Sequence, residues 1–156
     1  MHKKVIARRA SSWLDHSPTQ LLHRVTQCAG DIFRAHIEDG ELTPRQVAVL
    51  TAVAENASLN HTDIVGRTGI DRSTLTGVMR RLTRKGLLQR GRTKEDARAY
   101  TVTLTDAGSR ALRTAMPLAE KVDRQILAPL SPKDRAAFVS LLQTVIATLP
   151  SRRVTD

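Results

Sequence analysis

The stretch from Asn60 to Leu104 constrains the fold most, because it carries the signals of two short helices, a tight turn and a hairpin. Asn60 and Asp71 are both good N-cap residues, and Gly69 lies between them. This spacing is typical of a helix-turn-helix. A glycine-containing, arginine-rich hairpin pattern follows, so the stretch predicts a winged helix-turn-helix.

The helix expected from Asp71 to Lys85 has two chemically different sides, and Gly86 supplies its C-terminal stop. At 100° per residue, one side collects Leu75, Val78, Met79 and Leu82. The opposite side collects Ser73, Gly77, Arg80 and Arg84, flanked by Thr76 and Arg81. A helix divided in this way fits the major groove of DNA, although an ordinary solvated basic face has the same pattern.

The hairpin favours the DNA interpretation. Residues 87–90 can form one strand, and Tyr100, Val102 and Leu104 alternate with small residues as its antiparallel partner. Residues 91–98 between them form a basic tip. An arginine on such a tip can enter the minor groove, where the negative potential is strongest.

Composition points to a polyanionic partner. The 156 residues carry a formal net charge of +10, with a pI near 11.0, which favours nucleic acid first and an anionic membrane second. No apolar run approaches the ~20 residues needed to span a membrane, and we expect no signal peptide. A single cysteine, Cys28, fits a reducing cytoplasm, where we expect the protein to act.

Helices are predicted on both sides of the central stretch. Their apolar stripes and caps place them at residues 18–38, with Pro18 at N1, at 43–56, from 105 to about 127, and at 131–149. The first and the last two exceed what a winged module needs, so we expect them to form a dimer. Residues 1 to about 17 fit either an arm that orders against a partner or a solvated tail.

The expected fold is therefore mainly α with a small β-hairpin. We divide the chain into an N-terminal arm and first dimerisation helix (1–40), a winged helix-turn-helix DNA-binding domain (41–105), and C-terminal dimerisation helices (106–156).

This order of elements resembles the MarR family of bacterial transcription regulators over residues 18 to 149. The motifs that carry the resemblance are Thr43-Pro-x-Gln46, the run from Gly69 to Thr76, Arg81-Leu82 followed by residues 85–88, and Asp96-Ala-Arg98 leading to residues 102–105. Each motif is weak alone, but their shared order and spacing are specific.

The resemblance implies a homodimeric repressor on a pseudo-palindromic operator in double-stranded DNA, with half-sites about one helical turn apart. It implies that Arg98 enters the minor groove and that Asp96 holds the wing in shape. The predicted DNA contacts are Arg72, Ser73, Thr74, Thr76, Gly77, Arg80, Arg84, Arg92, Lys94 and Arg98. Relatives often have Arg at the position of Gly77 and Asp at that of Arg80, so operator preference should differ here.

Family members are commonly released from DNA by a small ligand, so the resemblance implies an effector such as an aromatic acid or its CoA thioester. Candidate lining residues are Trp13, His16, His23, Arg24 and Cys28, although none forms a specific motif. We expect Cys28 to be a packed small hydrophobe within its helix, which disfavours a cysteine-based redox sensor.

A nucleoid-type protein stays open as another class at this point, while a metal site and an enzyme find little support. A nucleoid-type protein would use the same charge without sequence selectivity. A metal site at His61 and Asp63 lacks further ligands at recognisable spacing, and we expect no cofactor. The sequence shows no Ser/His/Asp set, phosphate loop or paired carboxylates, so we expect no enzyme.

Overall fold

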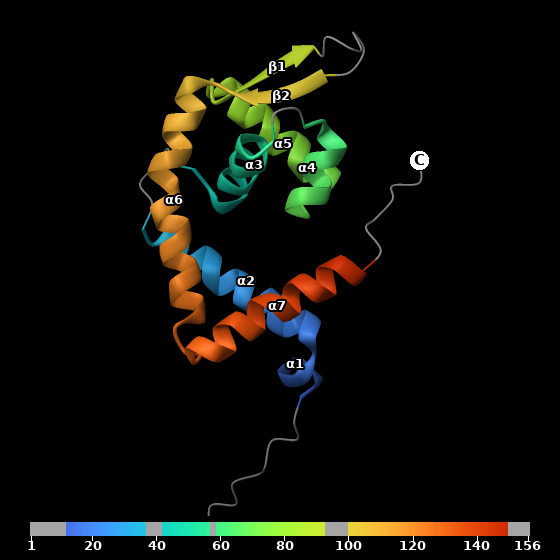
Figure 1. Ribbon diagram of the computed structural model, residues 1–156, viewed down its shortest axis with the longest axis vertical. Helices are drawn as coiled ribbons and strands as arrows, with labels where there is room; N and C mark the ends of the chain where they lie inside the picture. The colour runs from blue at the N-terminus through green and yellow to red at the C-terminus, as the bar shows by residue number, and fades with distance from the viewer. Residues whose placement is uncertain (1–11, 37–41, 57–58, 93–99, 150–156) are drawn as a thin grey trace, which may run out of the picture.

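The computed structural model (Figure 1) describes residues 12–36, 42–56, 59–92 and 100–149. Within these ranges the protein is mainly α with one two-stranded antiparallel hairpin, as predicted. The elements are α1 (Trp13–His16), α2 (Pro18–Arg34), α3 (Pro44–Ala54), α4 (His61–Thr68), α5 (Arg72–Arg84), β1 (Leu88–Arg92), β2 (Tyr100–Leu104), α6 (Asp106–Leu127) and α7 (Pro132–Thr148).

Helix α6 joins two groups of elements (Figure 1). One end of α6 lies beside the hairpin and α3, which α4 and α5 adjoin, and its other end lies beside α2 and leads into α7, with α1 on the far side of α2. The best-buried side chains belong to the first group, since Leu50, Ile64, Leu75 and Leu82 are fully enclosed there. Phe33 of α2 and Leu112 and Val122 of α6 belong to the same buried cluster, so the core continues from the winged part into these two helices.

The hairpin is longer than predicted. Its register runs from Leu88 opposite Leu104 to Arg92 opposite Tyr100, so Gly91 and Arg92 are paired strand residues and not part of the tip. Thr101 lies opposite Gly91, and the Thr101 hydroxyl donates to the Gly91 carbonyl at 3.4 Å. Leu59 adds a bridge to Val102, which ties the hairpin to the start of α4.

Two helix predictions need correction. Helix α2 ends at Arg34 and not near residue 38, because the ring of His36 turns back and its Nδ1 lies 2.8 Å from the Ile32 carbonyl. That contact satisfies a carbonyl at the end of the helix. The expected stop at residues 39–40 lies outside the described ranges. The short helix α1, capped by Ser12, was not predicted.

Helix α7 has an apolar side that the rest of the chain does not cover. None of its residues is buried, and Leu141, Ile146 and Leu149 are 66%, 72% and 61% exposed. Trp13 and Leu14 of α1 are exposed as well. A set of large apolar side chains in water is typical of a surface that another chain covers.

Within the described ranges, no helix is both long enough and sufficiently apolar to cross a lipid bilayer.

Candidate nucleic-acid interface

Local sequence signals shape the helix-turn-helix as predicted. Asn60 accepts the Asp63 N–H at 2.9 Å, and the Asp63 carboxylate accepts the Asn60 N–H at 3.0 Å, so both halves of a capping box start α4. Gly69 ends the helix with a φ of 67°, a left-handed conformation that favours glycine. Asp71 then caps α5 by accepting the Thr74 N–H at 2.9 Å.

Helix α5 is divided as the sequence predicts. Leu75, Val78, Met79 and Leu82 are buried against the core. On the other side, Ser73, Arg80 and Arg84 are exposed, and a methyl group at Gly77 would meet no atom within 4 Å. The exposed side is therefore open to a partner without disturbing the core.

Several hydroxyl groups of α5 are already engaged within the protein. Ser73 Oγ donates to the Asp71 carboxylate at 2.7 Å, and Thr76 Oγ1 donates to the Arg72 carbonyl at 2.9 Å. Hydrogen bonds from Thr74 and then Ser73 hold the pKa of Asp71 below its ordinary value, so the cap stays ionised. Arg80 and Arg84 are thus the stronger candidates for donating hydrogen bonds to DNA.

The predicted contacts divide by position. Arg72, Ser73, Thr74, Thr76, Gly77, Arg80 and Arg84 come together on α5. Arg92 is a β1 residue whose side chain is not described, and Lys94, Asp96 and Arg98 lie outside the described ranges.

Two residues near this surface were not among the predicted DNA contacts. Arg90 is exposed on β1. His61, at the first position of α4, places Nε2 3.2 Å from Thr76 Oγ1. Burial, followed by the charges of Arg72 and Arg90, lowers the pKa of His61. No sequence pattern links residues 61, 76 and 90, because their proximity depends on how α4, α5 and β1 pack.

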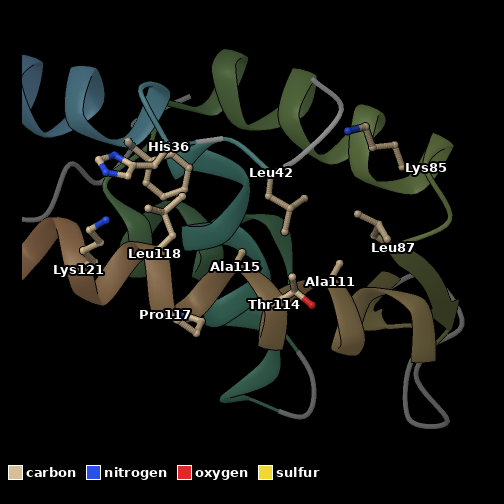
Figure 2. Close-up of a pocket in the computed structure, with 11 residues that line it drawn as sticks. His36, Leu42, Lys85, Leu87, Ala111, Thr114, Ala115, Pro117, Leu118 and Lys121 are labelled. Carbon is tan, nitrogen blue, oxygen red and sulfur yellow. The ribbon is translucent and has the colours of Figure 1, made fainter. Parts of the chain in front are cut away.

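A cavity of about 780 Å³ lies between α2, the end of α5 and the middle of α6 (Figure 2). Its lining is mainly apolar, with cationic side chains toward both ends. The lining residues are Phe33, His36, Leu42, Lys85, Leu87, Ala111, Thr114, Ala115, Pro117, Leu118 and Lys121. This size and composition are typical of small-molecule sites.

The residues predicted to line an effector site do not line this cavity. Trp13, His16, His23, Arg24 and Cys28 lie on α1 and the exposed side of α2, where Arg24 pairs with Asp15 at 3.8 Å. Cys28 is exposed, so its predicted packing was wrong for this chain: α2 packs inward through Ala29, Ile32 and Phe33 instead. The lining itself draws on three separate segments, which no local pattern connects.

His61 and Asp63 have other contacts, with Thr76 and with the Asn60 N–H respectively. Among the described residues, no cluster of three or more His, Cys, Asp or Glu side chains has the arrangement of a metal site.

Comparison with known proteins places these features among DNA-binding regulators. The model of the MarR family matches residues 42–100. The homoprotocatechuate degradative operon repressor of Escherichia coli is 30% identical over 137 residues, which cover 88% of this chain and 93% of the relative.

Two solved structures are similar over most of their length. The PcaV transcriptional regulator from Streptomyces coelicolor, in complex with its natural ligand, is 32% identical with a TM-score of 0.78, and the match covers 89% of this chain and 98% of PcaV. BpsR from Bordetella bronchiseptica, whose DNA binding is regulated by 6-hydroxynicotinic acid, is 34% identical with a TM-score of 0.74, covering 81% and 96%.

Proposed function

Because the chain belongs to the MarR family, we propose that it is a homodimeric transcription repressor that a small aromatic acid releases from DNA. In this proposal α5 enters the major groove, and the hairpin contacts the neighbouring minor groove. A repressor of bacterial operons meets its operator in the cytoplasm, so we assign the protein to that compartment.

The observation that carries the proposal is the division of α5. Its apolar side is fully used in the core, while Arg80 and Arg84 on its other side are exposed. The major groove admits one α-helix, and arginine pairs with guanine there through two hydrogen bonds. The net charge of +10 provides the attraction to phosphates that such docking requires.

We expect Arg80→Ala to weaken operator binding roughly 5- to 100-fold while leaving binding to random duplex nearly unchanged, because a base contact contributes about 1–3 kcal/mol of discrimination. Gel shifts at one fixed salt concentration measure both affinities. Arg113→Ala, which removes an exposed arginine from α6, is the matched control and should bind like the wild type.

The same measurement separates a repressor from a nucleoid-type protein. A specific repressor should prefer its own operator over random duplex by ~10³ or more. A ratio near one for the wild-type protein would contradict the proposal and favour binding by charge alone.

The cavity is the proposed effector site. It combines apolar walls for a planar ring with the Lys121 ammonium group, which can bind a carboxylate. His36 lies near Lys121 at the same end (Figure 2), and because its Nδ1 contacts the Ile32 carbonyl, Nε2 is the ring nitrogen left for a ligand. The regulation of BpsR by 6-hydroxynicotinic acid supports this class of ligand.

The position of the cavity suggests how a ligand would change DNA affinity. Lys85 caps the end of α5 and Leu87 precedes β1, and both belong to the wall that faces α6. A ligand in contact with both sides favours the relative position of α5 and α6 that fits it best. Release from DNA follows if that position differs from the DNA-bound one.

We expect Lys121→Met to weaken binding of aromatic acids by roughly ten-fold or more, because a hydrogen bond to a charged group contributes about 1.5–3 kcal/mol. Calorimetry with 6-hydroxynicotinate, homoprotocatechuate, benzoate and aryl-CoA esters measures the loss. Lys133→Met, on α7 and outside the cavity lining, is the control. If no compound in the panel bound the wild-type protein, the aromatic-acid class would be rejected.

A further inference from the structure

The contact between His61 and Thr76 links the two helices of the helix-turn-helix. His61 begins α4, and Thr76 lies in the middle of α5, with 3.2 Å between Nε2 and Oγ1. A second link runs nearby, where Arg72 Nη2 donates to Thr62 Oγ1 at 3.4 Å. Thr76 therefore lies where the side of α5 that faces α4 meets the exposed side.

The hydroxyl group of Thr76 has one hydrogen, and the protein offers two acceptors for it. If Nε2 of His61 carries a proton, that N–H donates to Thr76, whose hydroxyl donates to the Arg72 carbonyl at 2.9 Å. If Nε2 is bare, it is itself an acceptor for the hydroxyl hydrogen. In either tautomer the Thr76 hydroxyl can donate within the protein, and its oxygen is held beside α4.

His61 is suited to this positioning role because it stays uncharged near neutral pH. Burial, then Arg72 and Arg90, lower its pKa below the ordinary histidine value. Its Nδ1 is enclosed and has no hydrogen-bond partner among the described residues. The ring therefore acts as a fixed neutral neighbour of Thr76 and not as a cation for phosphates.

We propose that His61 makes Thr76 a reader of thymine, by holding the Thr76 hydroxyl on the protein and leaving the methyl group as the part that contacts a base edge. The 5-methyl group of thymine is the apolar feature of the major groove, and threonine methyl groups pack against it. This inference rests on the proposed docking of α5 in the major groove. Within it, Thr76 selects a base by apolar contact and Arg80 by hydrogen bonds.

Deoxyuridine scanning of a bound duplex tests the inference, because deoxyuridine lacks only the 5-methyl group of thymine. The duplex is the sequence that the wild-type protein selects from a randomised library. We expect one thymine per half-site at which the replacement weakens wild-type binding about four-fold, the effect of one buried methyl-sized group.

Two substitutions at Thr76 distinguish the methyl group from the hydroxyl. Thr76→Val keeps a methyl group and removes the hydroxyl, so it should keep the thymine preference at that position. Thr76→Ser keeps the hydroxyl and removes the methyl group, so it should bind thymine and uracil equally there. The opposite pattern, or a wild-type protein that binds specifically with no uracil-sensitive position, would overturn the inference.

A pair of variants at His61 tests positioning. His61→Gln retains an N–H donor and should preserve the thymine preference, whereas His61→Leu should reduce it without lowering the melting temperature below that of His61→Gln. Equal thymine preference in both variants would show that His61 does not position Thr76. Failure of the wild-type protein to select any sequence would instead contradict the proposed function itself.

Discussion

Replacing both Leu141 and Ile146 with glutamate is expected to convert the dimer into a folded monomer whose operator affinity is roughly 10²- to 10⁴-fold lower. The two side chains are 66% and 72% exposed in the single chain, so replacing them should leave its own core intact. In a dimer they would become buried, and burying an unpaired carboxylate is strongly unfavourable. Loss of one recognition helix then removes the avidity gained by binding two half-sites.

Light scattering measures the oligomeric state, and gel shifts measure the affinity. The matched control replaces Ser140 and Ala147 with glutamate. Both residues are exposed on the opposite side of α7, so this variant carries the same added charge away from the proposed interface. Residues 1–40 and 106–156 are the segments assigned to dimerisation. If the Leu141/Ile146 variant stayed dimeric, the dimer interface would not include this side of α7.

Gly108→Ala is expected to lower the free energy of unfolding by about 3 kcal/mol, the upper part of the range for an overpacked core. The new methyl group would lie 2.0 Å from the Leu87 carbonyl oxygen and 3.2 Å from Leu104 Cδ2. Little room can be made, because the same carbonyl accepts the Thr105 N–H at 3.2 Å and Thr105 Oγ1 donates to the Gly86 carbonyl at 2.6 Å.

Urea unfolding at one fixed protein concentration, followed by circular dichroism, measures the change. Gly66→Ala serves as the control, since a methyl group at this α4 position meets no atom within 4 Å. It should instead stabilise the protein by about 0.5–1 kcal/mol, because alanine favours the helix more than glycine does. Similar urea midpoints for the two variants would disprove the close packing of α6 on Leu87.

Helix starts could be predicted because the residues that cap them are local. The Thr43 capping box with Gln46, the Asn60 box and the Asp71 cap all appear as expected. Ser131 is a partial exception. Ser131 with Asp134 three residues later is the sequence pattern of a capping box. The Ser131 side chain accepts the Asp134 N–H, but its hydroxyl donates to the Asp134 carboxylate, so the reciprocal half of the box is not formed.

Predictions failed where the answer depends on distant contacts. Helical periodicity alone would place Val47, Leu50, Val53 and Ala54 on one buried face of α3. Ala54 is exposed, whereas Val49 and Ala52 are buried because α4, α5 and α6 cover other sides of that helix. At the end of α2, the His36 side chain contacts the Ile32 carbonyl, which the apolar periodicity of the helix does not indicate. The residues that line the cavity are spread from Phe33 to Lys121 along the chain, so no local sequence pattern predicts the cavity.

The division of α5 also bears on how such a regulator diverges. Leu75 and Leu82 are fully enclosed, so their replacement costs stability, and Gly108 admits no larger side chain. Gly77 has open space around it, and Arg80 and Arg84 have no role in the core. Mutations at these exposed positions can therefore change the preferred operator without unfolding the protein. After gene duplication, a copy could acquire a new target gene through a few such changes while keeping its scaffold and its cavity.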